Sequence, residues 1–381
     1  MRIAIDARIM YYPKCGISSY VFNLVKNIIK LDKSIELFLF SDNPIQAQYD
    51  VFNTPRITKV IFASSKKEKK RWFSKYLPKK LKEYRIDLYH ATWNWGIPFF
   101  KSCPCILTIH DLAPWILGGH FKNKRKEIRY KLRHLLSAHL ADLIITDSYK
   151  SREDIVRVLK VKKDKVKVVY LGLDEEFSEE MESNYIETIL SKYNLTKDKY
   201  LIDPLGIDHL RRNALIVLEG FYDCLSQINN NLKLVYTGNF YNESIEYIKL
   251  IKRIEKLKLQ DKVIITGWIP TEELKALISK AKIAIIPSLY EGFGLPILEC
   301  FSCGVPLISS DRGAIPEVAG DAVVYFNPDD YRDLSFKIID LLKKEDLQNY
   351  LIRKGRERLK NFSWGKTASE TLKIYKNLCN R

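Results

Sequence analysis

The sequence has little of what interrupts, disorders or anchors a chain in a membrane. Among its 381 residues, glycine occurs 16 times and proline 14 times, a low usage that excludes collagen-like and linker-dominated architectures. No apolar run approaches the ~18 residues that a membrane-spanning helix needs, and Asp6 interrupts the N-terminal segment before a signal-like apolar region can form. Since 46% of the residues are hydrophobic, the chain can build a substantial core. We therefore expect a soluble, cytoplasmic protein with two to three domains of roughly 150 residues each.

The cysteines lack the pattern of a disulfide framework or of a zinc site. Seven are present, which is an odd number. The pair Cys300-x-x-Cys303 has neither a second such pair nor a nearby histidine that would complete a metal site. We expect reduced thiols that pack as small hydrophobic side chains.

Positive charge is abundant and unevenly distributed. The formal net charge is +17. Residues 1–150 carry 27 lysines and arginines against 12 acids, whereas residues 151–381 carry 36 against 34. A genome-wide preference for lysine would spread the charge along the chain. The concentration in the first part instead indicates attraction to a polyanion, either a nucleic acid or an anionic membrane surface.

Two stretches carry most of this charge. Lys66–Lys82 contains nine basic residues and one acid, interleaved with aromatic and leucine side chains, and we expect Pro78 to divide it into two short helices. Lys122–Arg133 adds seven basic residues and one acid. A basic segment that bears aromatic residues is typical of an interfacial membrane element, although a solvated charged face has the same composition. The residues predicted to form a membrane or acceptor surface are Lys69, Lys70, Arg71, Trp72 and Phe73.

Short β-branched segments alternate with amphipathic helical segments in both halves of the chain. The predicted strands of the first half are Ile3–Ala7, Glu36–Phe40, Lys59–Phe62, Leu88–Ala91, Cys105–Ile109, Leu143–Thr146 and Val166–Tyr170. Those of the second half are Tyr200–Pro204, Leu232–Thr237, Val263–Thr266, Ile283–Pro287, Val305–Ser309 and Ala322–Tyr325. Apolar strands separated by helices imply parallel sheets that are covered on both faces.

The pattern therefore predicts an α/β protein with two doubly wound, Rossmann-like domains at residues 1–173 and 200–361. The acid-rich segment 174–199 has no clear strand, and we interpret it as the inter-domain connection. Residues 362–381 are predicted to form a C-terminal helix, opened by Ser363, that crosses back toward the other domain. A ligand is expected in the cleft between the domains, at the carboxyl ends of the strands.

Two glutamates stand eight residues apart in the motif Glu291-Gly-Phe-Gly-Leu-Pro-Ile-Leu-Glu299, directly after the predicted strand Ile283–Pro287. Its glycines permit close approach of the backbone, and Pro296 suits the first turn of a helix. The carboxylates can accept hydrogen bonds from vicinal hydroxyls of a ribose or a hexose. The backbone N–H groups that can receive a phosphate are those of Phe293, Gly294 and Leu295. An ordinary strand–helix turn with two surface acids has the same pattern.

This motif resembles the signature of the family 4 retaining glycosyltransferases, which have the GT-B fold. Further motifs similar to those of the family follow in the expected order along nearly the whole chain. They are Gly16-Ile-Ser-Ser-Tyr20, Thr108-Ile-His-Asp-Leu112, Thr146-Asp-Ser148, Leu171-Gly-Leu-Asp174, Arg211-Arg-Asn213, Cys303-Gly-Val-Pro-Leu-Ile308, Gly313-Ala-Ile-Pro-Glu317 and Phe362-Ser-Trp364. The resemblance implies that the first domain binds the acceptor and the second the nucleotide sugar.

The resemblance assigns the basic pair Arg211 and Arg212 to the diphosphate of the sugar donor. Guanidinium groups suit bidentate contact with phosphate and would stabilise the leaving group. The family usually has lysine at the second position, so Arg212 is a departure that conserves charge. A frequent variant has arginine directly after the preceding glycine, where this chain has Ile207. A surface-charge reading of the pair stays open.

Four further residues receive roles by the same resemblance. Glu299 would bind the ribose, Glu291 would lie near the donor sugar, and Gly16 would allow the backbone to approach the diphosphate. His110 ends a predicted strand and would lie beside the transferred sugar. Asp111 either orients His110 or caps the next turn.

The resemblance implies transfer of a hexose with retention of anomeric configuration. The best match is to mannosyl- and rhamnosyl-transferring members, which indicates GDP-mannose as the donor. A cationic first domain suits a lipid-linked or anionic glycan acceptor, in the synthesis of bacterial O-antigen, capsule or lipopolysaccharide, at the inner face of the plasma membrane. No Asp-x-Asp pair has the context of a metal site, so we expect no cofactor and no required metal.

Three alternatives stay open. A UDP- or dTDP-sugar donor would keep the fold and the reaction, because base selectivity lies in loops that the motifs do not define. Non-transferring sugar epimerases share two similar domains but differ at the motifs above. A nucleic-acid-binding protein would explain the charge alone, yet no recognition module is visible and specific nucleic-acid binding is not expected.

Overall fold

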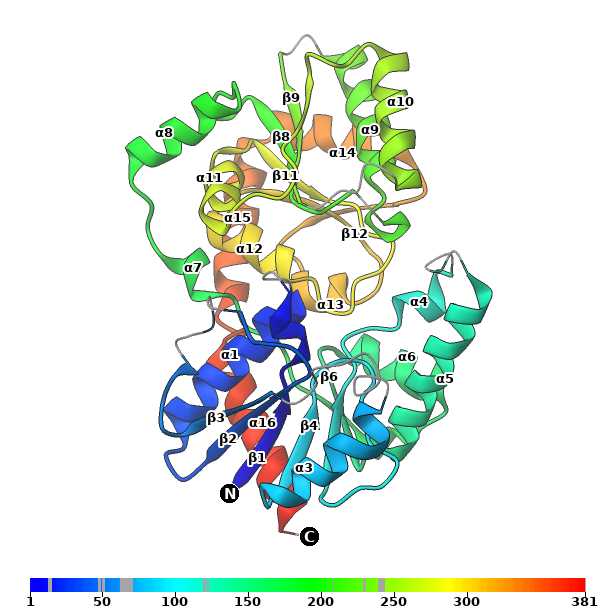
Figure 1. The fold of residues 1–381 in the computed structure, drawn as a ribbon. Helices are drawn as coiled ribbons and strands as arrows, with labels where there is room; N and C mark the ends of the chain where they lie inside the picture. Colours follow the sequence, from blue (N-terminus) through cyan, green and yellow to red (C-terminus); the bar gives the residue numbers. More distant parts are fainter. Residues whose placement is uncertain are drawn as a thin grey trace. The chain divides into compact units, whose positions relative to one another are not determined.

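The computed structural model describes residues 1–12, 16–46, 49, 52–61, 71–118, 121, 123–207, 209–228, 231–238 and 244–380. The chain divides into two compact units, Met1–Gly172 with Phe362–Arg381, and Leu173–Asn361. Each unit is an α/β body built around its own parallel sheet (Figure 1). The predicted pair of doubly wound α/β domains is thereby confirmed.

Within the described residues, the first unit contains a seven-stranded sheet in the order β3-β2-β1-β4-β5-β6-β7. Its strands are β1 (Arg2–Asp6), β2 (Glu36–Ser41), β3 (Ile57–Ile61), β4 (Leu88–Ala91), β5 (Cys105–Thr108), β6 (Leu143–Thr146) and β7 (Val166–Val168). Its helices and helical turns are η1 (Arg8–Tyr11), α1 (Gly16–Leu31), η3 (Trp72–Tyr76), α3 (Leu77–Glu83), α4 (Ala113–Ile116), α5 (Lys124–Leu140), α6 (Tyr149–Leu159), η4 (Lys163–Lys165) and α16 (Trp364–Cys379). All pairs of neighbouring strands in this sheet are parallel over the described residues.

Helices bury both faces of this sheet. Phe38, Tyr89 and Leu107 join one core cluster with side chains of α3, α5 and α6. On the opposite face, the β4 residue His90 bonds to Tyr375 of α16, and α1 packs against α16. Burial from both sides explains why the strands read as continuous apolar runs.

The second unit has a six-stranded parallel sheet in the part of the chain that the structure describes, in the order β10-β9-β8-β11-β12-β13. Its strands are β8 (Tyr200–Asp203), β9 (Lys233–Tyr236), β10 (Val263–Ile265), β11 (Ile283–Ile286), β12 (Leu307–Ser310) and β13 (Val324–Phe326). Its helices and helical turns are α7 (Glu175–Ser178), α8 (Ser183–Lys192), η5 (Leu210–Arg212), α9 (Ala214–Gln227), α10 (Ile245–Leu257), α11 (Thr271–Lys280), α12 (Leu295–Cys303), α13 (Ile315–Ala319), α14 (Tyr331–Lys343) and α15 (Glu345–Leu359).

The chain changes direction along each sheet at one point. Strand order reverses between β1 and β4 in the first unit and between β8 and β11 in the second. In open α/β sheets, ligands bind at the carboxyl ends of the strands on either side of such a switch point. The loops after these four strands are therefore where each unit's functional residues are sought.

Residues 174–199 do not form the separate connection that we predicted, and the structure places them in the second unit. The acidic run forms α7 and α8, and both helices pack against α11. Lys275 of α11 donates to the carbonyl oxygens of Glu176 and Glu179. The buried Lys275 therefore fixes α7 to α11, a contact that the composition of the segment does not predict.

The C-terminal helix α16 belongs to the first unit. Ser363 caps it by accepting a hydrogen bond from Lys366 N at 3.3 Å. Gly172 permits its close approach, because a Cβ at that position would stand 2.1 Å from the backbone nitrogen of Trp364. Among the described residues, no helix combines the length and the apolar character needed to cross a bilayer.

Candidate functional site

The loop after β11 brings the predicted donor residues of the second unit together. Glu291 is buried, and its Oε1 accepts from Arg212 Nη1 at 2.6 Å and from Ser288 Oγ at 2.7 Å. Arg211 Nη1 lies 3.9 Å from Glu291 Oε2. Burial alone would raise the pKa of Glu291, but the two guanidinium groups outweigh it and lower the pKa. Glu291 is therefore a carboxylate held between two cations.

The backbone beneath Glu291 is held by the Gly313-Ala314 segment. Ala314 N donates to Glu291 O at 2.9 Å. Gly313 has φ +61°, and a Cβ there would stand 2.5 Å from Glu291 O. Only glycine fits this conformation and this contact without strain. The motif at 313–317 thus fixes the backbone of Glu291 through Gly313 and Ala314.

The two arginines come from η5, in the loop after β8. Leu289 N donates to Arg211 O at 2.7 Å, which joins this loop to the one after β11. Asn213 follows in the left-handed conformation and donates through Nδ2 to Pro328 O at 2.9 Å, in the loop after β13. The basic motif is thereby anchored to the loops after β11 and β13, and it follows β8 at the switch point of the sheet.

Helix α12 begins at the end of the same loop. Gly294 precedes it with φ +100°, and Pro296 occupies its first turn. The first N–H groups of any helix lack intrahelical acceptors and carry partial positive charge. Phe293 is buried, and Glu299 stands one turn into the helix, half-buried. Two guanidinium groups beside a helix N-terminus make a site that suits a diphosphate.

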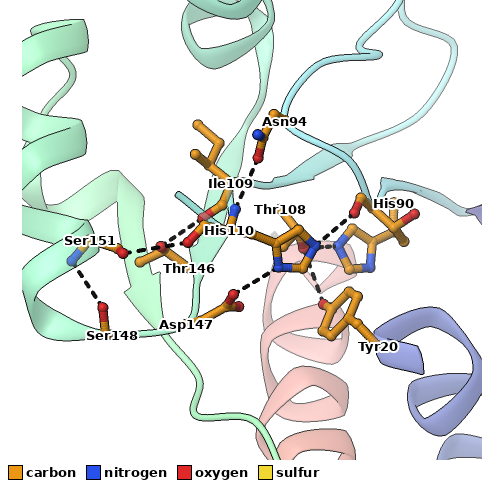
Figure 2. Close-up of polar contacts among 11 residues, drawn as sticks. Tyr20, His90, Asn94, Thr108, Ile109, His110, Thr146, Asp147, Ser148 and Ser151 are labelled. Atoms are coloured by element: carbon orange, nitrogen blue, oxygen red, sulfur yellow. Dashed lines mark hydrogen bonds and ion pairs between the residues drawn. The ribbon is translucent and has the colours of Figure 1, made fainter. Parts of the chain in front are cut away.

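In the first unit, His110 follows β5 and pairs with Asp147, which follows β6 (Figure 2). His110 Nδ1 lies 2.8 Å from Asp147 Oδ2, and Nε2 lies 3.1 Å from Thr92 O. Burial alone would lower the pKa of His110, but the carboxylate and the carbonyl oxygen outweigh it and raise the pKa. Both ring nitrogens face acceptors, so the geometry favours the imidazolium ion.

Asp147 is the partner of His110 in this structure, and sequence reasoning did not identify it. Asp111, the residue considered for orienting His110, instead accepts from Ala113 N at 3.1 Å at the start of α4. Asp147 was visible only as part of the motif at 146–148. Because β5 and β6 are adjacent parallel strands, residues that directly follow them meet at one edge. That adjacency was the available signal.

Three buried polar side chains, those of His90, Thr108 and Tyr20, form a hydrogen-bonded chain beside His110 (Figure 2). His90 Nε2 lies 2.7 Å from Thr108 Oγ1, which lies 3.1 Å from Tyr20 OH. The Tyr20 ring meets His110 edge-on, with centroids 4.9 Å apart. Burial lowers the pKa of His90 to about 3, so that ring stays neutral. These contacts position His110 through α1 and β5.

Gly16 is the first residue of α1. A Cβ at this position would meet no atom within 4 Å. The chain itself therefore does not require glycine here, and the assignment of Gly16 to a diphosphate stays a prediction.

A cavity of about 350 Å³ lies at the switch point of the first sheet. Arg8 follows β1, is held by both carboxylate oxygens of Asp6 at 2.9 and 2.7 Å, and lies under the rings of Phe73 and Trp95. Arg133 stacks on Trp95, with its Cζ atom 5.2 Å from the centroid of the ring. Gly96 also lines the cavity, and a Cβ there would crowd Phe73 at 3.2 Å. Aromatic walls with guanidinium groups suit a polar ring or an anionic group.

The predicted membrane surface is wrong for Trp72. Its side chain is 2% exposed, and Leu77 and Leu81 are buried with it in the core. Phe73 is partly buried and lines the cavity with Trp72, whereas Arg71 is exposed. Lys69 and Lys70 lie outside the described residues. The apolar side chains of this segment therefore face the core and the cavity, because a helix that covers a sheet must bury its apolar stripe.

Comparisons with known proteins decide the family. A family model described as Glycosyl transferases group 1 matches residues 186–358, and a second, Glycosyltransferase Family 4, matches residues 15–177. The chain belongs to the group 1 glycosyltransferases. The predicted family and the predicted enzymatic class of this glycosyltransferase are thereby confirmed.

Relatives and solved structures agree with this assignment. The glycosyltransferase is 28% identical to the O-antigen chain mannosyltransferase B of Escherichia coli, over 78% of this chain and 76% of that protein. It is 25% identical to the serotype-specific mannosyltransferase WbdA of Escherichia coli, over 72% of this chain but only 33% of that protein. The structure of Anabaena HepE with UDP-glucose has a TM-score of 0.78 at 16% identity and covers 99% of this chain and 100% of its own. This last likeness shows the GT-B fold.

Proposed function

We propose that this glycosyltransferase is a retaining mannosyltransferase that uses GDP-mannose. The observation that carries the donor site is the cluster of Arg211, Arg212 and Glu291 beside the start of α12. Its cations match the charge of a sugar-linked diphosphate. The choice of mannose is supported by the mannosyltransferase names of the E. coli relatives.

The chemistry divides between charge stabilisation and positioning. The bond between the sugar C1 and the diphosphate oxygen breaks as a bond from C1 to the acceptor oxygen forms on the same face. The proton of the acceptor hydroxyl passes to the leaving phosphate. Arg211, Arg212 and the N–H groups of Phe293, Gly294 and Leu295 stabilise the negative charge that grows on the diphosphate. Glu299 binds the ribose, and Gly16 approaches the diphosphate.

Glu291 and His110 are the residues proposed to contact the transferred sugar. In this structure Arg212 donates to Glu291. A diphosphate that binds the Arg212 guanidinium would replace Glu291 as its acceptor, and the carboxylate could then accept hydrogen bonds from sugar hydroxyls. The Nε2 of His110 now faces Thr92 O, and contact with the sugar requires exchange of that bond. Asp147 keeps the ring protonated and oriented during this exchange.

We propose a lipid-linked or polysaccharide acceptor in the synthesis of a bacterial surface glycan such as O-antigen, capsule or lipopolysaccharide. The cavity lined by Arg8, Trp95 and Arg133 would hold the sugar or phosphate part of that acceptor. A lipid-linked acceptor places the enzyme at the inner face of the plasma membrane. The arginine pair replaces a metal ion as the charge partner of the diphosphate, so we expect no metal requirement.

A donor panel tests this function. The purified full chain is given GDP-mannose, UDP-glucose or dTDP-rhamnose with a lipid extract of bacterial membranes, and sugar incorporation is measured with magnesium or with EDTA. We expect incorporation from GDP-mannose in both conditions, with an α-linkage in the product by NMR. Incorporation from another donor alone would overturn the mannose assignment, and a β-linkage would overturn retention.

A second candidate function is polyanion binding, which the excess charge of residues 1–150 favours. A salt titration against duplex DNA and anionic vesicles separates the two. Tight DNA binding at physiological salt, together with no turnover of any donor, would favour the second candidate.

A further inference from the structure

Helix α5 carries an apolar stripe that the first unit does not cover. Ile128 is 65% exposed, Leu132 53% and Leu136 38%. Residues four positions apart share one face of a helix, so these three side chains form a single row. The opposite side fixes the helix to the unit through buried His134, Ser137 and Ala138. In Figure 1, α5 lies at the margin of the first unit.

The same helix is strongly basic. It contains six lysines and arginines and one acid, Glu127. Glu127 is paired with Lys131 at 2.6 Å, so the one acid of the helix is engaged with one of its cations. Arg125 and Arg129 are exposed and stand at helical spacing from Ile128 and Leu132. The stripe is therefore bordered by positive charge.

A neighbouring loop extends the apolar row. Phe99 is 59% exposed and Phe100 78% exposed, the highest exposure among the large hydrophobic side chains of the described residues. Lys101 holds this loop against the end of α5 by donating to Leu140 O at 2.9 Å. Phe99 and Leu136 line the same cavity. We define the docking face as Ile128, Leu132, Leu136, Phe99 and Phe100.

We propose that the docking face inserts into an anionic membrane surface. Exposed leucine, isoleucine and phenylalanine side chains gain free energy when they leave water for the acyl boundary, and the flanking guanidinium groups gain from anionic headgroups. A second copy of this chain would bring two positive faces together, which disfavours self-association. Aliphatic side chains gain nothing on a nucleic acid, where phosphates would engage the cations alone.

This inference deepens the proposed function, because a lipid-linked acceptor is available only to an enzyme held at a bilayer. The cavity of Arg8, Trp95 and Arg133 shares Phe99 and Leu136 with the docking face, so an acceptor headgroup would be reached at the membrane surface. The docking face also takes over the membrane role predicted for the segment around Trp72, because Trp72, Leu77 and Leu81 are buried in the core.

The experiment is cosedimentation of the full chain with vesicles of phosphatidylethanolamine and phosphatidylglycerol. Vesicles of phosphatidylcholine alone serve as the uncharged comparison. We expect binding to the anionic vesicles that weakens with salt, and a loss of about tenfold or more in Ile128→Ser/Leu132→Ser. Arg125→Gln/Arg129→Gln should lose about tenfold on anionic vesicles only. Leu132→Met should keep the binding of the parent chain.

A matched control exists on α10, where Ile245 is 54% exposed and Ile248 41% exposed on another basic helix. Ile245→Ser/Ile248→Ser should bind vesicles like the parent chain. Equal loss in both pairs, no binding by the parent chain, or a dimer in ultracentrifugation that Ile128→Ser/Leu132→Ser abolishes would each overturn the proposal. The nucleotide-induced shift in melting temperature reports the donor site separately, so a failure of docking is distinguishable from a failure of the proposed function.

Discussion

The two units each place a cation against a buried carboxylate at the carboxyl ends of parallel strands, but the cations differ in kind. In the second unit Arg212 and Glu291 meet at 2.6 Å, and arginine keeps its charge at every physiological pH. In the first unit His110 and Asp147 meet at 2.8 Å, and histidine can lose its charge near neutrality. One pair is permanent and the other can be titrated.

This difference matches the two tasks that the units are proposed to perform. A diphosphate leaving group carries charge throughout the reaction and needs a permanent counter-charge. The residue beside the sugar acts as a hydrogen-bond donor, and the neighbouring carboxylate sets its pKa. Breaking either pair, or moving the pH, therefore has distinct consequences in the two units.

The largest effect is expected from Arg212→Ala. The substitution removes a cation from the diphosphate and leaves Glu291 buried without its closest partner. We expect the rate of transfer to fall about 10²- to 10³-fold, measured as mannose incorporation from GDP-mannose. Arg312→Ala is the matched control, because Arg312 is an exposed arginine of the same unit that pairs with Asp329. Equal losses in both variants would show that the pair at Glu291 has no special role.

Gly313→Ala disturbs the same pair through the backbone. The added Cβ would approach Glu291 O at 2.5 Å, in a φ region that alanine avoids. We expect a loss of about 2–3 kcal/mol in the free energy of unfolding of the second unit, or about 5–10 °C in melting temperature. Gly365→Ala in α16 meets no atom within 4 Å and should stabilise its helix by about 0.5–1 kcal/mol. Calorimetry of the two variants compares them, and an unchanged transition in Gly313→Ala would contradict the packing described.

Asp147→Asn breaks the titratable pair while keeping its shape. Without the carboxylate, burial lowers the pKa of His110 and the ring becomes neutral. We expect the rate of transfer to fall about 10- to 100-fold, as for the loss of one positioned electrostatic partner. Asp111→Asn, which alters the acceptor of the Ala113 N–H at the start of α4, should retain nearly full activity. A rate for Asp147→Asn equal to that of Asp111→Asn would remove Asp147 from the site.

The smallest effect is expected from pH alone. The pKa of His110 is raised above its ordinary value of 6.5, so its contribution to folding stability is complete below 6.5 and is lost as pH rises through the higher folded value. The lowered pKa of Glu291 gives the opposite dependence, with stability present above 4.5 and lost only in acid. The stability difference between the parent chain and Asp147→Asn should therefore shrink as pH rises above 6.5, measured by denaturant unfolding. A difference that grows with pH would contradict the ion pair.

The sequence predicted the strands well because both faces of each sheet are buried. Leu88–Ala91 and Leu143–Thr146 have the predicted bounds. The predicted strand Val166–Tyr170 is shorter in the structure and ends at Val168. Its neighbour β6 ends at Thr146, whose carbonyl oxygen accepts the last hydrogen bond, from Val169 N. Burial from both sides turns each strand into an apolar run that sequence alone reveals.

Side-chain direction was harder to predict. The segment of Trp72 and the helix of Leu132 are both basic and both bear apolar residues, yet Trp72 is 2% exposed and Leu132 53% exposed. Composition does not tell which helix covers the sheet, since that depends on tertiary packing. The same holds for Asp147, whose meeting with His110 follows from strand order and not from distance along the chain.

The most direct test of the donor site is the melting temperature of the full chain with GDP, UDP, dTDP or ADP, with and without magnesium, in the parent chain and in Arg212→Ala. A ligand that binds only the folded state raises this temperature, by an amount that follows its concentration relative to its dissociation constant. We predict a shift that is selective for GDP, independent of magnesium and absent in Arg212→Ala. No shift with any of the four nucleotides, or an equal shift in the variant, would contradict the assignment of the diphosphate to Arg211 and Arg212.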